Sequence, residues 1–258
     1  MPTALITGAT AGLGLGYAQA LAGRGLDLVL VARNEERLGA VAADLVSRFG
    51  VAVEVLPADL ADRGDVDRVA VRLADPGRPV RVLVNNAGFG LRRSFVDTDV
   101  EDEQRMLDVM VTAVMRLTHA VLPGMIERDA GMILNVSSMA GWFPGGTYSA
   151  AKSWVTVFSE SLSVGLTGTQ VRVIAVCPGF IRTEFHERAG MDMSRTPDWM
   201  WLDVGAVVDR SFRDMALGRP VSVAGHHYPV FARLLLHGPR TLTRRFAGAR
   251  TRLSRRSD

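Results

Sequence analysis

Apolar segments that read as β-strands alternate with helical segments along most of this 258-residue chain. Six strands are expected at residues 3–7, 26–32, 51–56, 80–84, 132–136 and 171–176, and a seventh at 220–224. Helices are expected between them, at residues 14–24, 34–48, 63–73, 100–128 and 148–166. Nearly continuous apolar strands that alternate with helices are typical of a parallel sheet buried on both faces. The sequence therefore predicts an α/β fold, with a doubly wound parallel sheet of about seven strands and helices on both faces.

No linker, internal repeat or low-complexity segment interrupts this pattern, so we expect one domain over residues 1–258. The regularity fades after Pro178, and residues 182–217 read as a substrate-loop region. Residues 238–258 read as a basic C-terminal tail, because the chain from Arg233 onward has eight arginines and one acid, Asp258. Such a tail can bind membrane headgroups or nucleic acid, but a solvated terminus is the more common case and the one we favour.

The composition, 48% hydrophobic and 22% charged, is that of a soluble globular protein. No apolar run approaches the roughly 18 residues of a membrane span, and no basic segment precedes the first strand as it would in a signal peptide. The single cysteine, Cys177, excludes an internal disulfide and fits a reducing compartment. Cys177 follows an apolar run, so it reads as a small buried residue rather than a nucleophile. We expect a cytoplasmic protein.

A glycine-rich turn, Thr7-Gly8-Ala9-Thr10-Ala11-Gly12-Leu13-Gly14, directly follows the first expected strand. Glycine permits a tight turn and lets backbone amides approach a phosphate at the positive end of a helix. A turn of this kind can also be a plain connection between a strand and a helix. Its place at the start of an alternating α/β chain favours a dinucleotide-phosphate site.

The end of the second expected strand indicates which dinucleotide would bind. An acid at this point accepts hydrogen bonds from a free ribose 2′-hydroxyl, whereas a cation holds a 2′-phosphate. The chain has Arg33 here and no acid at the strand tip. Glu35 and Glu36 follow in the first turn of a helix that Asn34 is expected to cap, where the helix dipole accounts for them. Arg33 can be an ordinary solvent-facing arginine, but the pattern favours NADP over NAD.

Lys152 is the one lysine among 30 basic residues, and it lies four positions after Tyr148. Residues four apart on a helix share one face, about 5.4 Å apart along the axis. A neighbouring ammonium favours the phenolate, so we expect Lys152 to lower the pKa of Tyr148 and fit it for proton transfer near neutral pH. Most pairs with this spacing are ordinary surface neighbours, and the catalytic interpretation depends on the other motifs.

Those motifs occur in order at the ends of successive strands: the glycine turn, Asp59-Leu60, Asn85-Asn86-Ala87-Gly88, Ser137-Ser138, Tyr148-x3-Lys152 and Pro178-Gly179. The set resembles the short-chain dehydrogenase/reductase family, of the NADP-preferring type. The resemblance covers residues 2–183 well and the remainder loosely. It implies a Rossmann-like fold, a nicotinamide cofactor and a homodimer or homotetramer formed through the helices around residues 103–126 and 149–166.

The resemblance also implies roles for individual residues. Tyr148 would be the general acid/base, Lys152 would bind the nicotinamide ribose, and Ser138 would hydrogen-bond the substrate oxygen, with Ser137 as the fallback. Besides Tyr148 and Lys152, the implied cofactor-binding residues are Gly8, Thr10, Ala11, Gly12, Leu13, Gly14, Arg33, Asp59, Leu60, Asn86, Ala87, Gly88, Pro178, Gly179, Ile181 and Thr183. No metal is implied.

Two features depart from the family pattern. Tyr148 follows Ser138 by only ten positions, which predicts a shortened pocket rim over residues 142–146. Met110 stands where the family often has an asparagine that holds a water next to the lysine. Methionine cannot do this, since its sulfur is only a weak acceptor. A slower enzyme or a different water path follows, unless Met110 is plain core packing.

The sequence as a whole predicts an NADP-dependent oxidoreductase that interconverts a carbonyl and a secondary alcohol on a small, mostly apolar molecule. Five aromatic residues are available to line an apolar pocket, although packing explains such residues equally well: Trp142, Phe143, Phe180, Phe185 and Trp199. The alternative is a nucleotide-binding sensor or scaffold with weak or no catalysis, motivated by Met110. We expect no nucleic-acid partner and no membrane span.

Overall fold

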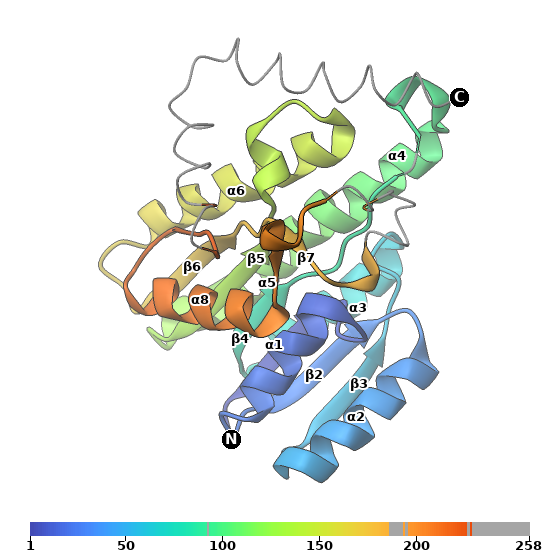
Figure 1. Ribbon diagram of the computed structural model, residues 1–258. Coiled ribbons are helices and arrows are strands. Elements are labelled where there is room, and N and C mark those ends of the chain that lie inside the picture. The colour runs from blue at the N-terminus through green and yellow to red at the C-terminus, as the bar shows by residue number, and fades with distance from the viewer. Residues whose placement is uncertain (92, 186–192, 194–195, 226–227, 229–258) are drawn as a thin grey trace.

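The computed structural model describes residues 1–91, 93–185, 193, 196–225 and 228. Seven strands form one parallel sheet in the order β3-β2-β1-β4-β5-β6-β9 (Figure 1). They are β1 (Thr3–Thr7), β2 (Asp27–Ala32), β3 (Val53–Pro57), β4 (Val80–Asn85), β5 (Gly131–Val136), β6 (Val171–Val176) and β9 (Val221–Ser222). The chain builds outward from β1 in one direction and then from β4 in the other. The predicted doubly wound, Rossmann-like sheet is confirmed.

Helices cover both faces of the sheet and bury an apolar layer on each. One face carries α1 (Gly12–Ala22), α2 (Glu35–Phe49) and α8 (Val204–Ala216), with α1 and α8 packed side by side (Figure 1). The other face carries α3 (Arg63–Ala74), α4 (Val100–Leu107), α5 (Ala113–Glu127) and α6 (Gly146–Gly165). Strand side chains alternate between the layers, so that Leu28 and Leu30 face α1 while Val29 and Val31 face α3.

The predicted start of α2 is confirmed in detail. The side chain of Asn34 accepts a hydrogen bond from the Arg37 backbone N–H at 2.8 Å, which satisfies one of the unpaired donors of the first turn. Glu35 and Glu36 occupy that first turn. The helix ends at Gly50, whose positive φ of 68° suits glycine.

The long helix expected at residues 100–128 is continuous but not uniform. Residues Asp108–Thr112 between α4 and α5 form one turn of π-helix, which the sequence did not predict. Among the described residues, Val100–Glu127 is the one helical stretch long and apolar enough to cross a membrane by length and composition. Its buried side chains, Met106 and Leu117 among them, pack against the sheet as those of a core helix do.

A second, two-stranded sheet pairs β7 (Phe180–Ile181) with β8 (Trp201–Leu202). A 3₁₀ turn, Asp198–Met200, leads into β8. Both β8 and α8 lie inside the region expected to be a substrate loop, and α8 packs into the core. The loop-like part of that region therefore ends before α8. Residues 186–192, 194–195 and the whole of the predicted basic tail, 238–258, lie outside the described residues.

The last strand in the described part of the chain, β9, is held both by backbone bonds to β6 and by a side chain. It pairs with β6 through only two residues, Val221 and Ser222. The Ser222 hydroxyl donates to the buried carboxylate of Asp214 at 2.8 Å, and Arg210 and Arg219 each bond the same carboxylate at 2.7 Å. Asp214 thus joins the end of α8 to the edge of the sheet.

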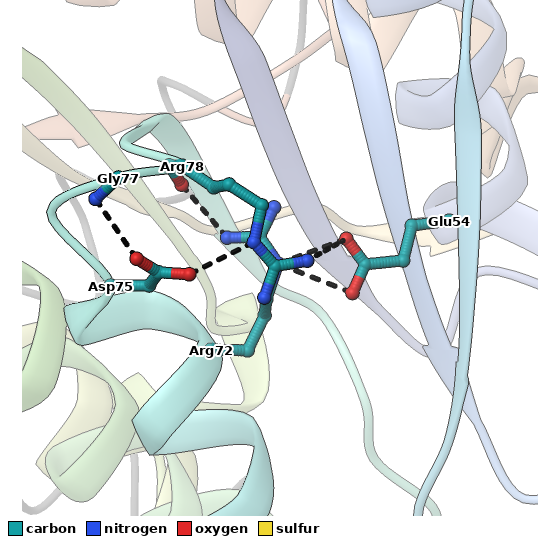
Figure 2. Close-up of polar contacts among 5 residues, drawn as sticks. All are labelled: Glu54, Arg72, Asp75, Gly77 and Arg78. Atoms are coloured by element: carbon teal, nitrogen blue, oxygen red, sulfur yellow. Dashed lines mark hydrogen bonds and ion pairs between the residues drawn. The ribbon is translucent and has the colours of Figure 1, made fainter.

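A polar network closes the edge of the sheet at which the strands begin. Figure 2 shows Arg72 and Arg78 pointing toward the carboxylate of Glu54. The buried Arg72 bonds Glu54 at 2.9 Å and the Arg78 carbonyl at 2.8 Å, and Asp75 accepts from Arg78 at 2.9 Å. These bonds tie β3 to the turn between α3 and β4. A hollow of about 570 Å³ beside this network lies at the edge opposite the residues discussed below.

Candidate active site

The predicted phosphate turn joins β1 to α1 at the edge where the strands end. Gly8 and Gly12 have φ values of +66° and +54°, a region that glycine adopts without strain. A Cβ at Gly14 would lie 2.2 Å from the Gly8 carbonyl oxygen, so the turn folds back on itself too tightly for any side chain there. Ala11, at the N-cap of α1, provides no side-chain cap, so the backbone N–H groups of the first turn have no side-chain partner among the described residues and are available to a phosphate.

Asn86 and Thr7 fasten this turn to the end of β4. The Asn86 side-chain amide donates to the carbonyl oxygens of Thr7 at 3.0 Å and Gly8 at 3.2 Å. The Thr7 hydroxyl accepts from the backbone N–H groups of Asn86 at 2.9 Å and Ala87 at 3.0 Å. The side chain of Asn86 thus holds the glycine turn in its conformation through these hydrogen bonds, a role that the sequence did not predict.

Arg33 lies exposed at the tip of β2, where the sequence predicted a 2′-phosphate contact. Within the part of the chain that the structure describes, its guanidinium has no hydrogen bond or ion pair. One turn into α2, Arg37 pairs with Glu184 at 3.4 Å. The guanidinium of Arg33 at the tip of β2 is therefore available to a ligand. The segment that contains Glu184 lies close by, next to the start of α2.

The residues predicted at the adenine position are engaged within the protein. The Asp59 carboxylate accepts from the Ala61 backbone N–H at 3.1 Å and pairs with Arg105 of α4. Leu60 is 7% exposed and packs in the core beneath α3. Arg105 was not singled out in the sequence, because an ion pair between residues 46 positions apart leaves no local pattern.

Tyr148 and Ser138 lie together above the end of β5. Ser138 begins a single 3₁₀ turn, Met139–Trp142, and its hydroxyl accepts from the Ala140 backbone N–H at 3.1 Å. The Ser138 side chain lies near the Tyr148 hydroxyl and acts on its pKa as a hydrogen-bonding partner of the phenolate. Burial raises the pKa of Tyr148 to about 12, and Ser138 offsets this only in part. The chain can pass from Ser138 to Tyr148 in so few residues because Gly141 packs directly on the α6 backbone. A Cβ at Gly141 would lie 2.8 Å from the Lys152 carbonyl carbon.

Lys152 is buried one helical turn beyond Tyr148. Its Nζ donates to the Val136 carbonyl oxygen at 2.8 Å and lies 5.8 Å from the centroid of the Tyr148 ring. Burial lowers the pKa of Lys152 to about 8. The predicted proximity is confirmed, but the expected effect on Tyr148 is wrong: the pKa of the phenol is raised, because desolvation of the phenolate outweighs an ammonium that is hydrogen-bonded elsewhere.

Ser137 faces away from Tyr148 and into α6. Its hydroxyl donates to the Lys152 carbonyl oxygen at 2.6 Å and lies 2.7 Å from the Thr156 hydroxyl. The thiol of Cys177 is fully buried next to Thr156, and burial raises its pKa to about 11, as expected of a packing residue. Ser137 therefore supports the helix, and Ser138 is the serine that the fold brings to Tyr148.

Met110 occupies the π-helical turn and is 1% exposed. A Cβ at Gly88 would lie 3.1 Å from the Met110 sulfur and 3.7 Å from Nζ of Lys152. The thioether thus packs at the end of β4, on the same side of Gly88 as the ammonium. Met110 fills this space with apolar atoms. The methionine in place of the family's asparagine therefore changes the surroundings of Lys152 directly.

The segment from Pro178 to Thr183, here called the strap, leaves the end of β6 and crosses to the glycine turn. A Cβ at Gly12 would lie 3.1 Å from the Thr183 methyl group, so Thr183 rests on the turn itself. Near its start, the strap contacts Tyr228, a residue that the sequence did not single out. The predicted phosphate, nicotinamide and catalytic residues therefore converge on one edge of the sheet.

Comparison with known proteins agrees with this geometry. Residues 2–194 match the family model described as short chain dehydrogenase. Sulfoacetaldehyde reductase 2 from Chromohalobacter salexigens is 42% identical over 186 residues, 70% of this chain and 73% of that protein. Very-long-chain 3-oxoacyl-CoA reductase from Anas platyrhynchos is 37% identical over 189 residues, 70% of this chain but only 60% of the duck protein.

The fold of a solved relative extends the similarity to nearly the whole chain. A short-chain dehydrogenase from Sphingobium yanoikuyae, in complex with NADPH, aligns with a TM-score of 0.82 and 35% identity, covering 98% of this chain and 95% of that one. The chain belongs to the short chain dehydrogenase family of oxidoreductases.

Proposed function

We propose that this protein is an NADP-dependent reductase or dehydrogenase that interconverts a carbonyl and a secondary alcohol. The observation that carries the proposal is the convergence of Ser138, Tyr148 and Lys152 at the same edge of the sheet as a glycine turn that leads into the uncapped start of α1. The uncommitted cation of Arg33 at the tip of β2 supports a 2′-phosphate and hence NADP. The NADPH in the Sphingobium yanoikuyae relative supports the same choice.

The residues present fit a dinucleotide phosphate at the glycine turn. Gly8 and Gly12 give the turn its positive φ values, and within the described chain the first turn of α1 has no side-chain cap, so its backbone N–H groups can bind a phosphate. Thr183 and Ile181 of the strap would lie along the nicotinamide half, and Lys152 would hold its ribose. When bound, the cofactor supplies or accepts a hydride, and the chain supplies the proton and the charge stabilisation.

Tyr148 serves as the proton donor in the direction of reduction. Its raised pKa keeps the phenol protonated throughout the neutral range, so the donor form is the one present. As a carbonyl oxygen gains negative charge, hydroxyl groups at Tyr148 and Ser138 stabilise it, and the Tyr148 proton then passes to it. In the direction of oxidation the proton moves the other way, from the alcohol to the phenolate form of Tyr148, so this direction requires that the phenol first lose its proton.

The substrate proposed is a small, mostly apolar aldehyde or ketone. Phe185 lies with its ring centroid 5.9 Å from that of Tyr148, so it would form part of the wall beside the reacting carbonyl. Phe180 packs against Trp201 at 6.0 Å instead, and Trp199 is largely exposed. Two relatives are named for the reduction of an aldehyde and of a 3-oxoacyl thioester, which supports a carbonyl substrate.

Assembly with a second copy belongs to the proposal as well. The outer faces of α5 and α6 expose Met115, Val157 and Val164, and Trp154 stacks on Phe158 at 4.6 Å nearby. These are the helices through which a dimer or tetramer was predicted. Sedimentation of the purified protein measures the order of the assembly.

The direct test is to mix purified protein with NADPH and a panel of ketones and aldehydes and to follow NADPH absorbance. Oxidation of NADPH that depends on the added carbonyl and disappears in Tyr148→Phe supports the proposal. The second candidate is a nucleotide-binding sensor, favoured by the apolar Met110 beside Lys152. Tight NADPH binding without turnover on any carbonyl by the wild type would favour the sensor over the enzyme.

A further inference from the structure

Tyr228 lies far from Tyr148 in sequence, and its hydroxyl joins two segments of the site. It accepts a hydrogen bond from the Phe180 backbone N–H at 3.2 Å and donates one to the Met200 carbonyl oxygen at 2.6 Å. Phe180 begins β7, and Met200 directly precedes β8. A single phenol therefore connects the strap to the segment on the substrate side.

The ring of Tyr228 explains why Gly179 lacks a side chain. A Cβ at Gly179 would lie 2.1 Å from Cζ of Tyr228, and one at Gly225 would lie 3.0 Å from its Cδ2. The phenol end of the ring fills the slot beneath the strap, and Tyr228 is only 5% exposed. The sequence predicts a cofactor contact for Gly179, and in the structure this ring fills the position that a side chain there would take.

The small sheet that carries the strap needs such support. It consists of two residue pairs, Phe180 with Trp201 and Ile181 with Leu202. A ladder this short has little stability of its own. At its other end the strap rests on the glycine turn through Thr183, and Glu184 pairs with Arg37. Tyr228 is the anchor at the end nearer β6.

We propose that Tyr228 is a positioning residue that holds the strap in place against the nicotinamide half of the cofactor. This inference rests on the function proposed above. Tyr228 is too deeply buried beneath Gly179 to meet a substrate, so it acts through the backbone positions of Ile181 and Thr183. Its removal should therefore weaken one half of the cofactor site and spare the other.

The test compares two ligands in wild type and Tyr228→Phe. NADPH reaches both halves of the site, whereas adenosine 2′,5′-bisphosphate carries only the adenosine half. Loss of the hydroxyl leaves the Phe180 N–H and the Met200 carbonyl without their partner, so the dissociation constant for NADPH should rise about tenfold. The dissociation constant for adenosine 2′,5′-bisphosphate should stay within about twofold, and kcat within about threefold, because Tyr148 and Ser138 keep their contacts.

Tyr17→Phe is the matched control. Tyr17 is also a buried tyrosine whose hydroxyl makes a hydrogen bond, to Ser211 at 2.8 Å between α1 and α8. Tyr17→Phe should lower the melting temperature about as much as Tyr228→Phe does, without changing NADPH affinity. Gly179→Ala, which pushes the strap off the ring, should reproduce the selective loss seen in Tyr228→Phe.

Equal NADPH affinity in wild type and Tyr228→Phe would overturn the inference and leave the proposed function intact. So would an equal loss of both ligands, which is the mark of general destabilisation. Failure of the wild type itself to bind NADPH would instead remove the proposed function, and the inference with it.

Discussion

The ammonium of Lys152 is hydrogen-bonded to the carbonyl oxygen of Val136 at 2.8 Å, in a buried position with no carboxylate partner among the described residues. A carbonyl dipole compensates only part of the free energy lost when a charge leaves water. The lowered pKa of Lys152, about 8, expresses this cost. The protein therefore gives up stability at neutral pH to keep a cation at this place, a trade common at functional sites.

Lys152→Met should accordingly stabilise the fold while removing activity. At about pH 7 the variant should unfold with a free energy about 2 kcal/mol above that of the wild type, after allowance for the lost bond to Val136. The gap should shrink as the pH rises from about 8 toward 10.5, where folded wild type has lost the proton that its unfolded chain still holds. Urea unfolding across this range measures the gap, and no other lysine titrates in it. A gap independent of pH would contradict the assignment.

Tyr148→Phe removes the proposed proton donor but keeps the ring that packs on Phe185. We expect kcat to fall by about 10²–10⁴-fold, the usual contribution of general acid catalysis. NADPH affinity should change by less than about threefold, because the phenol is needed for proton transfer rather than for binding. Steady-state kinetics and a fluorescence titration with NADPH provide the two numbers. Retention of more than half of the wild-type kcat would rule out Tyr148 as the donor.

Arg33→Ala tests the choice of cofactor. A hydrogen-bonded ion pair with a phosphate contributes enough that NADPH affinity should fall roughly 10–100-fold. NADH lacks the 2′-phosphate, so its affinity should stay nearly unchanged. Arg81→Ala is the control, since Arg81 is also exposed but lies on β4 at the opposite edge of the sheet. Equal losses for both cofactors would refute the assignment of Arg33.

Met110→Asn addresses the apolar environment of Lys152. An amide in place of the thioether could hold a water beside Nζ, and kcat should rise by about twofold to tenfold if proton exchange at Lys152 limits turnover. Burying the amide should cost about 1–3 kcal/mol of stability. Met106→Asn, one turn earlier and equally buried, should show the same loss of stability without the gain in kcat. An unchanged or lower kcat in Met110→Asn would identify Met110 as packing alone.

Gly14→Ala should disrupt the phosphate turn. The new methyl group would lie 2.2 Å from the Gly8 carbonyl oxygen and 2.5 Å from Nδ2 of Asn86, so the turn must open to admit it. NADPH binding should be lost and stability reduced by at least about 2 kcal/mol. Gly39→Ala lies within α2 with nothing within 4 Å of its added methyl group, and should stabilise the protein by about 0.5–1 kcal/mol. Normal NADPH affinity in Gly14→Ala would show that the turn does not cradle the phosphates.

The sequence predicted the sheet and most helices because their signals are local. Alternating apolar runs mark the strands, and Asn34 marks its helix through a bond to a residue three positions away. The π-helical turn at Asp108–Thr112 has no such signal, since it depends on how α4 and α5 meet the neighbouring elements.

The sequence predicted which residues come together at the candidate site, but it did not predict their pKa values. Spacing alone brings Tyr148 and Lys152 to one helix face, as found. The pKa of each depends on burial, which sequence does not reveal, and burial reversed the expected shift of Tyr148. Tyr228, Arg105 and the side-chain role of Asn86 all rest on contacts across 28 to 79 positions, so no local pattern in the sequence predicts them.

The attachment of β9 through Asp214 has a consequence for mutations remote from the cofactor. Tyr228 follows Ser222 by only six positions, so we expect a substitution that loosens β9 also to weaken the contact between Tyr228 and the strap. A substitution of the buried Asp214 on α8 would then look like a defect in NADPH binding. If such a variant were assayed only by turnover at low NADPH, the defect would wrongly be assigned to the nucleotide pocket. At saturating NADPH its turnover should be normal, because the reacting residues are intact.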